Sequence, residues 1–387
     1  MSAPRLELAL FWGAVGMLGY TYVAFPAAVL VRGLVGRRPH QTGARTPRVT
    51  VVVAAHNEVA AIGSKLDNLL AVDYPRDRFE VIVASDGSDD GTNEVIAGFA
   101  EHGVRLLTLP RVGKATALNE AVAASTGEIV VFSDANTLYA PDAIHALVRP
   151  FADPEVGGVA GDQRYVRDST AVASATGEQR YWDFDRLLKI GESRAGHVIS
   201  ATGAIYAVRR ELIDHVPDGV TDDFFVSTGV IAYGKRLVFA PDAIAYEPVA
   251  ATSKVELGRK VRIITRGLRA VAARRVLLDP RRHGFYAVQL FSHKVLRRLM
   301  AFPLIGAAVS SPLLWRQGQM YRAATIAQVA FYAAAGFGLR RKEAPSRGVA
   351  GRMLALPAYF VLVNAACLRA VWNILRGTRI DRWEPQR

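Results

Sequence analysis

Residues 8–31, LALFWGAVGMLGYTYVAFPAAVLV, contain no charged side chain. A helix needs about 20 apolar residues to cross the hydrocarbon core of a bilayer, so this run is long enough to span a membrane. A signal peptide would have a shorter apolar region and a small-residue cleavage site, and we therefore expect a retained transmembrane helix within residues 1–33. Arg32, Arg37 and Arg38 border the run, which predicts that the following part of the chain lies in the cytoplasm.

Three further apolar runs lie at residues 299–315, 323–339 and 353–375. Each is marginal in length, and any one alone would also fit a buried helix of a soluble protein. Three in succession favour about three transmembrane helices. The basic loop at 340–352 and the basic tail at 376–387 both predict a cytoplasmic position, which cannot hold if every run spans. Either one run is re-entrant or interfacial, or one basic segment breaks the charge rule.

Lys and Arg exceed Asp and Glu by 48 − 35 = 13. Such an excess fits nucleic acid, an anionic membrane surface or an anionic substrate. Residues 254–282 carry many cations at helical spacing with Val, Ile and Leu between them, as in helices that lie at a membrane interface. Nucleic-acid binding would need these charges on a soluble face, so we expect membrane lipids, and no nucleic acid, as partners. The single cysteine, Cys367, leaves no intrachain disulfide or cysteine metal cluster.

The middle of the chain alternates between two patterns. After a basic linker at 34–47, short runs rich in β-branched residues predict strands, and segments with helical spacing of apolar residues follow them. This alternation predicts an α/β domain with a mostly parallel sheet covered on both faces. In such sheets ligands bind beyond the carboxyl ends of the strands. The predicted strands are 49–55, 79–86, 104–110 and 128–134, and the predicted helices are 58–72, 90–103 and 114–126.

Polar residues follow each predicted strand. Helix capping explains Asp89 and Asp90, but it is a poor account of three acids, Glu58, Asp86 and Asp134, at one sheet edge. The polar segments that follow the four predicted strands are His56-Asn57-Glu58, Asp86-Gly87-Ser88-Asp89-Asp90, Arg111-Val112-Gly113-Lys114 and Asp134-Ala135-Asn136.

Acids beside cations suit a ligand with hydroxyl groups and a phosphate chain, such as a nucleoside diphosphate. Lys114 would supply a point charge to phosphate, Asp134 would help to hold a divalent cation, and Asp86 would accept hydrogen bonds from the base or ribose. The sequence has no GxGxxG and no GxxxxGK[ST] motif. It therefore supports neither a dinucleotide oxidoreductase nor a P-loop ATPase.

The order of VVVAAHNE, VIVASDGSDDGT, RVGKATALNEA, IVVFSDANTLYAPDA, TDDFF and RKVRI resembles the membrane-embedded family 2 glycosyltransferases, relatives of cellulose, hyaluronan and poly-N-acetylglucosamine synthases. The resemblance covers roughly residues 48–300. It implies a Rossmann-like GT-A domain, a nucleotide-sugar donor, Mg²⁺ or Mn²⁺, and inversion at the anomeric carbon. The expected organisation is a transmembrane helix at 1–33, a linker at 34–47, a GT-A domain at 48–250, interfacial helices at 251–298, transmembrane helices at 299–375 and a basic tail at 376–387.

The resemblance also assigns donor-side roles. Glu58 and Asp86 match the nucleoside-binding acids, with His56 beside them by position. Lys114 matches the basic group near the phosphates, and Asp134 matches the first Asp of the DxD motif.

The last DxD position is Asn136, which offers only a neutral carbonyl oxygen. Since Mg²⁺ takes one or two carboxylates alongside substrate phosphates, the sequence predicts a metal site at Asp134 and Asn136 that binds weakly until the donor is present.

Asp223 matches the general base of the TED motif. A sugar hydroxyl is a weak nucleophile, so a carboxylate must take its proton. Read without the family, residues 219–243 also fit a surface helix capped by Asp222 and a following strand. The residues expected on the acceptor side are Thr202, Gly203, Asp222, Trp182 and Arg259.

Two positions depart from the family pattern. Asp222 replaces the Glu of TED, which shortens the side chain and keeps the charge. In the QxxRW position only Arg262, expected at the donor diphosphate, matches, and Ile263 stands where a Trp would stack on the acceptor sugar. Processive polymer synthesis is therefore in doubt, unless Tyr181 or Trp182 takes over the stacking.

Two functions from different classes follow. The leading one is an inverting, metal-dependent glycosyltransferase of the plasma membrane, multi-pass with its catalytic domain in the cytoplasm, that moves a sugar from a UDP-sugar to a glycan or lipid-linked acceptor in envelope or exopolysaccharide synthesis. A homo-oligomer or an envelope-complex partner would be needed to thread a polymer. The alternative is a non-catalytic membrane protein that binds a nucleotide sugar, or a scaffold of an envelope complex.

Overall fold

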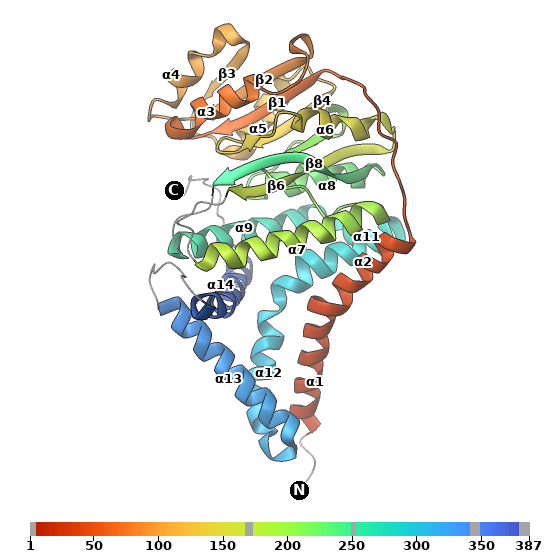
Figure 1. Ribbon diagram of the computed structural model, residues 1–387, viewed down its shortest axis with the longest axis vertical. Coiled ribbons are helices and arrows are strands. Elements are labelled where there is room, and N and C mark those ends of the chain that lie inside the picture. The colour runs from red at the N-terminus through yellow and green to blue at the C-terminus, as the bar shows by residue number, and fades with distance from the viewer. Residues whose placement is uncertain (1–4, 167–172, 249–252, 341–348, 379–387) are drawn as a thin grey trace.

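The computed structural model describes residues 5–166, 173–248, 253–340 and 349–378, with side chains described outside 165–166, 173–183, 248, 253–256 and 349–353. A sheet domain lies at one end, and a narrower bundle of helices extends away from it (Figure 1). A layer of helices lies between the two parts, and we call it the interfacial layer because of this position; it includes α7 (Ala173–Ala195), α9 (Ser253–Ala273) and α11 (Phe285–Leu290).

The sheet has eight strands in the order β3-β2-β1-β4-β7-β6-β8-β5. The first four in this order are parallel, β7 is antiparallel to both of its neighbours, β6 and β8 are parallel, and β5 is antiparallel to β8. The strands are β1 (Val49–Ala55), β2 (Phe79–Asp86), β3 (Val104–Leu109), β4 (Ile129–Asp134), β5 (Leu138–Tyr139), β6 (Val156–Val166), β7 (Tyr206–Arg209) and β8 (Arg236–Pro248).

The α/β class and all four predicted strands are confirmed. The sheet is mixed, however, rather than mostly parallel. Its second half contains β7, a strand of four residues, and β5, a strand of two, which are too short to give a period-2 pattern that sequence reasoning can detect.

Helices cover both faces of the sheet, as predicted. In β1, Val51 and Val53 belong to the core beneath α3 and α6, while Val52 and Ala54 belong to the core beneath α5 and α8. Burial of both faces explains why the strand is apolar throughout. The helices of this domain are α3 (Val59–Leu70), α4 (Thr92–Ala97), α5 (Lys114–Ala124), α6 (Ala143–Val148) and α8 (Asp222–Ala232).

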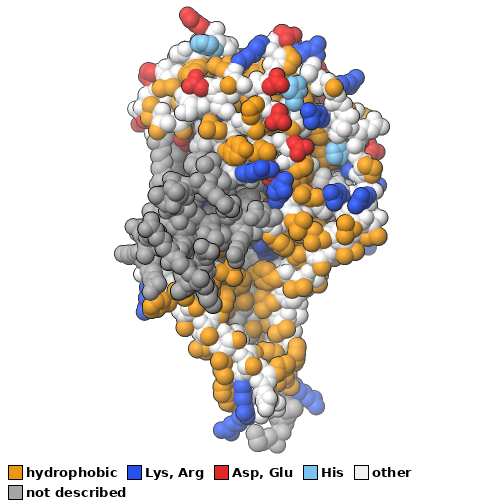
Figure 2. Space-filling model, viewed as in Figure 1, with side chains coloured by type: hydrophobic (Ala, Val, Ile, Leu, Met, Phe, Trp, Pro, Cys, Tyr) orange, Lys and Arg blue, Asp and Glu red, His pale blue; other side chains and the backbone are white. Residues whose placement is uncertain are grey.

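The N-terminal apolar run forms one helix, Arg5–Val35, made of α1 (Arg5–Gly19), a π-helical turn and α2 (Phe25–Val35). By length and composition, this helix and Leu354–Leu375 of α14 (Val349–Leu375) are the two candidate membrane spans in the described part of the chain. Hydrophobic side chains dominate the visible surface of the narrow helical part (Figure 2).

The other two C-terminal runs are weaker candidates. The apolar helix α12 (Ala301–Leu313) is shorter, and α13 (Gln319–Arg340) is not among the two described helices that are apolar and long enough to span. How many of these helices cross a membrane, and on which side the tail lies, stay predictions. Most of the basic loop at 340–352 and of the tail lies outside the described residues.

The N-terminal helix is held closely against the interfacial layer. A Cβ added to Gly33 of α2 would lie 2.6 Å from the carbonyl oxygen of Gly191 in α7, so the two helices touch backbone to backbone. Beyond α2, the amide of Arg38 donates to the carbonyl of Arg194 at 2.7 Å, and the guanidinium of Arg236 donates to the carbonyl of Arg38 at 2.6 Å. The predicted linker is therefore fastened to the sheet domain.

Candidate active site

One cavity of about 1500 Å³ lies between the sheet edge and the helices. It brings together ten of the residues predicted from the sequence: Glu58, Lys114, Asp134, Asn136, Thr202, Gly203, Asp222, Asp223, Arg259 and Arg262. His56 and Asp86 are not among the described residues that line it. Trp182 lies on α7, and its side chain is outside the described residues.

Lys114, the first residue of α5, connects the acids of two distant segments. Its Nζ donates to Oδ1 of Asp134 at 2.9 Å and lies 3.3 Å from Oδ2 of Asp222. Burial lowers the pKa of Lys114, but the charges of Asp134 and Asp222 outweigh this effect and raise it above its ordinary value. The lysine is therefore a fixed cation that holds the end of β4 against the start of α8.

The two neighbouring acids begin α8. Thr221, not Asp222, occupies the N-cap position, and Asp222 and Asp223 form the first turn, where the helix dipole favours negative charge. Burial, followed by the charge of Asp222, raises the pKa of Asp223 to about 6. A carboxylate with a pKa near this value is a stronger base than an exposed aspartate and is still ionised at neutral pH.

Asp134, the last residue of β4, lines the cavity close to the backbone of Gly203. A Cβ added to Gly203 would lie 2.8 Å from Oδ2 of Asp134, so only glycine lets the backbone approach this carboxylate. Asn136, in the same turn, is exposed and lines the cavity. The described residues hold no group of three or more His, Cys, Asp or Glu side chains that would bind a metal, and Lys114 already contacts Asp134. This donor set fits a divalent cation only together with phosphate oxygens.

Asp86, at the end of β2, is completely buried. Its Oδ1 accepts hydrogen bonds from the amides of Val112 and Gly113 at 2.7 and 2.8 Å, and its Oδ2 pairs with Nη1 of Arg111 at 2.6 Å. Nδ1 of His56 donates to the carbonyl oxygen of Asp86 at 2.8 Å. In this structure, Asp86 fixes the loop that leads into α5, and a direct contact of Asp86 with a nucleoside stays a prediction.

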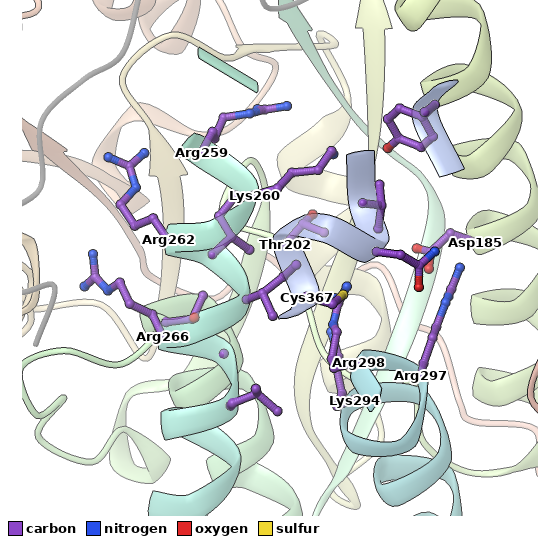
Figure 3. Close-up of a pocket in the computed structure, with 18 of the residues that line it drawn as sticks. Asp185, Thr202, Arg259, Lys260, Arg262, Arg266, Lys294, Arg297, Arg298 and Cys367 are labelled. Carbon is purple, nitrogen blue, oxygen red and sulfur yellow. The ribbon is translucent and has the colours of Figure 1, made fainter. Parts of the chain in front are cut away.

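The arginines of α9 line one side of the cavity (Figure 3). In this view Arg262 and Arg266 extend from one side of the helix, and Arg259 extends from its upper end. Nε of Arg266 donates to the carbonyl of Val220 at 3.0 Å, which supports the loop that precedes Asp222. Sequence reasoning missed Arg266, although its position one helical turn after Arg262 placed it on the same face.

Lys294, Arg297 and Arg298 also line the cavity, on the side of the apolar helices, as do Asp185 and Lys189 of α7. None of these residues was predicted. The three cations directly precede an apolar run. This pattern indicates positive charge at a membrane interface, but it does not indicate a ligand.

The family comparison covers the sheet domain and α9. A family profile described as "Glycosyltransferase like family 2" matches residues 47–278, more than half of the chain. The chain belongs to glycosyltransferase-like family 2.

The relatives of this family 2 chain include polysaccharide synthases by name. Poly-beta-1,6-N-acetyl-D-glucosamine synthase of Staphylococcus epidermidis is 25% identical over 252 residues, which is 63% of this chain and 59% of the relative. The synthase of Staphylococcus aureus (strain COL) matches with the same identity and coverage. The chain thus spans less than two thirds of the curated relatives it matches.

A solved structure is similar over nearly the whole length. The mannosyltransferase PcManGT of Pyrobaculum calidifontis, in complex with GDP-Man and Mn²⁺, has a TM-score of 0.73 and 26% identity, with 96% of this chain and 100% of that chain covered. The family 2 chain therefore has an α/β fold of the GT-A type.

Proposed function

We propose that this family 2 chain is a membrane-bound, inverting glycosyltransferase that moves a sugar from a nucleoside-diphosphate sugar to a hydroxyl group of a glycan or lipid-linked acceptor. The observation that carries the proposal is the contact of Lys114 with both Asp134 and Asp222. It joins the sheet edge that suits a nucleotide to the acids that suit proton removal, in a single cavity.

The transfer needs one bond to form and one to break. The acceptor oxygen attacks C1 of the donor sugar, and the bond from C1 to the diphosphate breaks with its electron pair leaving on the nucleoside diphosphate. Asp223 takes the proton of the attacking hydroxyl, and its raised pKa, about 6, suits this role at neutral pH. Attack from the face opposite the leaving group inverts C1.

The leaving diphosphate needs positive charge. Lys114 and Arg262 are the cations of the cavity that we assign to it, because Lys114 contacts Asp134 at the end of β4 and Arg262 lines the same cavity from α9. A divalent cation, held by Asp134 and Asn136 with the phosphate oxygens of the donor, would neutralise further charge on the diphosphate. The mannosyltransferase of similar structure was solved with GDP-Man and Mn²⁺, which supports a nucleotide-sugar donor and a divalent cation.

We also propose that this chain is not processive. Ile263 lines the cavity and is 45% exposed, and an isoleucine offers no aromatic face on which a sugar ring can stack. We further propose that the apolar helices Arg5–Val35 and Leu354–Leu375 span the plasma membrane, and that the basic residues beside the first of them, Arg32, Arg37 and Arg38, keep the sheet domain on the cytoplasmic side.

The test is a donor screen with the purified full-length chain in detergent. UDP- and GDP-sugars are added with Mg²⁺ or Mn²⁺, and release of the nucleoside diphosphate is measured. We expect one donor class to be consumed and the products to be short. If no nucleotide sugar is turned over while several bind, the chain is a nucleotide-sugar-binding protein and the proposal is wrong.

A further inference from the structure

The cavity continues past the catalytic acids to a cluster of cations. Lys294 belongs to a π-helical turn (Phe291–Val295), and Arg297 and Arg298 belong to the 3₁₀ turn that follows (Leu296–Leu299). All three line the cavity. In Figure 3, Arg298 extends toward Cys367 of α14 and Arg297 extends on the side of Asp185. The cluster therefore lies where the interfacial layer meets the apolar helices.

Beyond these cations the cavity is lined by side chains of α1, α12, α13 and α14, most of them apolar or aromatic, among them Val15, Leu18, Leu304, Ala307, Phe331 and Val363. Two amides among the described lining residues form hydrogen bonds within the helices themselves. Gln328 donates to Ser311 and to the carbonyl of Ala324, and Asn364 donates to the carbonyl of Phe360. Tyr22, Tyr332 and Tyr359 add hydroxyl groups to this lining, but most of its side chains carry no polar atom, which suits a hydrocarbon chain.

The charges of the cluster favour an anion. Burial and the neighbouring Arg298 lower the pKa of Lys294 to about 8, while Asp185 and Asp223 act in the opposite direction. Of these two acids, Asp185 already pairs with Lys189 at 3.2 Å, and Asp223 has a raised pKa. A phosphate placed among Lys294, Arg297 and Arg298 would offset the repulsion between the cations.

We propose that the acceptor is a membrane lipid in which a phosphate links the hydrocarbon to a hydroxylated head. The phosphate binds Lys294, Arg297 and Arg298, the hydrocarbon lies between α1, α12 and α14, and the head reaches Asp223. This inference rests on the proposed function, because it names the acceptor class of the same site.

The order of groups along the cavity matches the order of groups in such a lipid. A hydroxyl of the head attacks C1 of the donor, its proton passes to Asp223, and the bond from C1 to the diphosphate breaks, so the lipid phosphate stays intact as an anchor. Thr202 is placed to contact the head. Its Oγ1 is buried and has no hydrogen-bond partner among the described residues, and it lies between the arginines of α9 and the Lys294 cluster (Figure 3).

The first experiment compares acceptors with the full-length chain in vesicles. Phosphatidylinositol and a polyprenyl diphosphate that carries one hexose contain the phosphate, the chain and the hydroxyls. An octyl glycoside lacks the phosphate, and inositol 1-phosphate and hexose 1-phosphate lack the chain. We expect at least one of the two lipids to receive sugar with a KM at least tenfold below that of the partial acceptors. Equal use of the octyl glycoside, or of the water-soluble phosphates, would overturn the inference.

The second experiment separates the inference from the proposed function. Binding of the same lipids is measured without donor, by thermal stabilisation of wild type, Arg298→Gln and Arg281→Gln. Arg281 is an exposed cation of the short helix α10 (Pro280–His283), which precedes α11, and it does not line the cavity. We expect Arg298→Gln to weaken lipid binding about tenfold, as for a lost charged hydrogen bond, and Arg281→Gln to change it less than twofold. If neither lipid binds wild type, or if both variants behave alike, the inference fails even where donor turnover persists.

Discussion

The two ends of the cavity balance their charges in different ways. At the donor end, Lys114 contacts Asp134 and Asp222, and behind the cavity lining Arg111 contacts Asp86 in the loop that leads into α5, so acids and cations hold one another in place before any ligand arrives. At the membrane end, Lys294 and Arg298 lie beside an apolar wall. The donor end is therefore preorganised by the chain itself, whereas at the membrane end we infer that a lipid phosphate adds negative charge to that of Asp185 and Asp223.

The largest expected effect comes from the residue between the two ends. Asp223→Asn removes the base and should reduce transfer roughly 10²–10⁴-fold, while the KM for the donor changes little, because Lys114 and Asp134 keep their contact. Steady-state transfer at varied donor concentration measures both quantities. The exposed Asp218 of the same segment gives the matched control, and Asp218→Asn should keep wild-type rates. A normal rate for Asp223→Asn removes the residue from the mechanism.

Lys114→Met should reduce kcat/KM about 100-fold, because the leaving diphosphate loses a fixed cation and two acids lose their partner. The same change should also lower the melting temperature. Lys114→Arg keeps the charge and should recover part of the activity, so the ratio of the two variants separates charge from packing. Equal rates in both variants would show that the charge is irrelevant to transfer.

Gly203→Ala tests how closely the backbone must approach Asp134. The added Cβ would lie 2.8 Å from Oδ2 of that residue, so we expect on the order of a tenfold loss in kcat/KM and a higher Mn²⁺ concentration for half-maximal activity. Gly63→Ala is the matched control. Its Cβ would meet Val95 at an ordinary 3.6 Å within helix α3, and it should stabilise the fold by about 0.5–1 kcal/mol. An unchanged Mn²⁺ dependence in Gly203→Ala would speak against a metal at Asp134.

The smallest expected effect is on stability. Because burial and Asp222 raise the pKa of Asp223 from 3.8 to about 6, the folded chain binds this proton more tightly than the unfolded chain does. Stability should therefore fall as pH rises from about 4 to about 6. Asp223→Asn removes this cost, so the variant should melt above wild type at pH 8 and at nearly the same temperature at pH 4. A variant that melts below wild type at pH 8 would refute the assignment of this pKa.

Much of the donor end follows from the sequence. The apolar runs that end in Asp86 and Asp134 identify strands, and the parallel arrangement of β2, β1 and β4 places the ends of these strands at one edge. The pairing of Asp86 with Arg111 could also have been predicted from the sequence. Arg111 follows β3, and β3 lies beside β2, which ends in Asp86. The sequence could not show that the carboxylate of Asp86 would be occupied by contacts with Arg111, Val112 and Gly113.

The membrane end was less predictable for a physical reason. Lys294 and Arg298 face a cavity only because α1, α12 and α14, from opposite ends of the chain, pack around it. No local pattern encodes a contact between segments so far apart in the sequence. In addition, basic residues that line a cavity and basic residues that only border a bilayer give the same sequence pattern beside an apolar run. The antiparallel strands β5 and β7 escaped prediction because they are short.

The central claim is that one cavity presents a donor sugar to Asp223 with the Lys294 cluster on the acceptor side. The most direct test is a structure of the Asp223→Asn variant with a nucleotide-sugar donor and Mn²⁺. The account predicts the diphosphate between Lys114, Asp134 and Arg262, with C1 of the sugar facing residue 223. A donor bound outside this cavity, or inside it with C1 turned away from residue 223, would contradict the account.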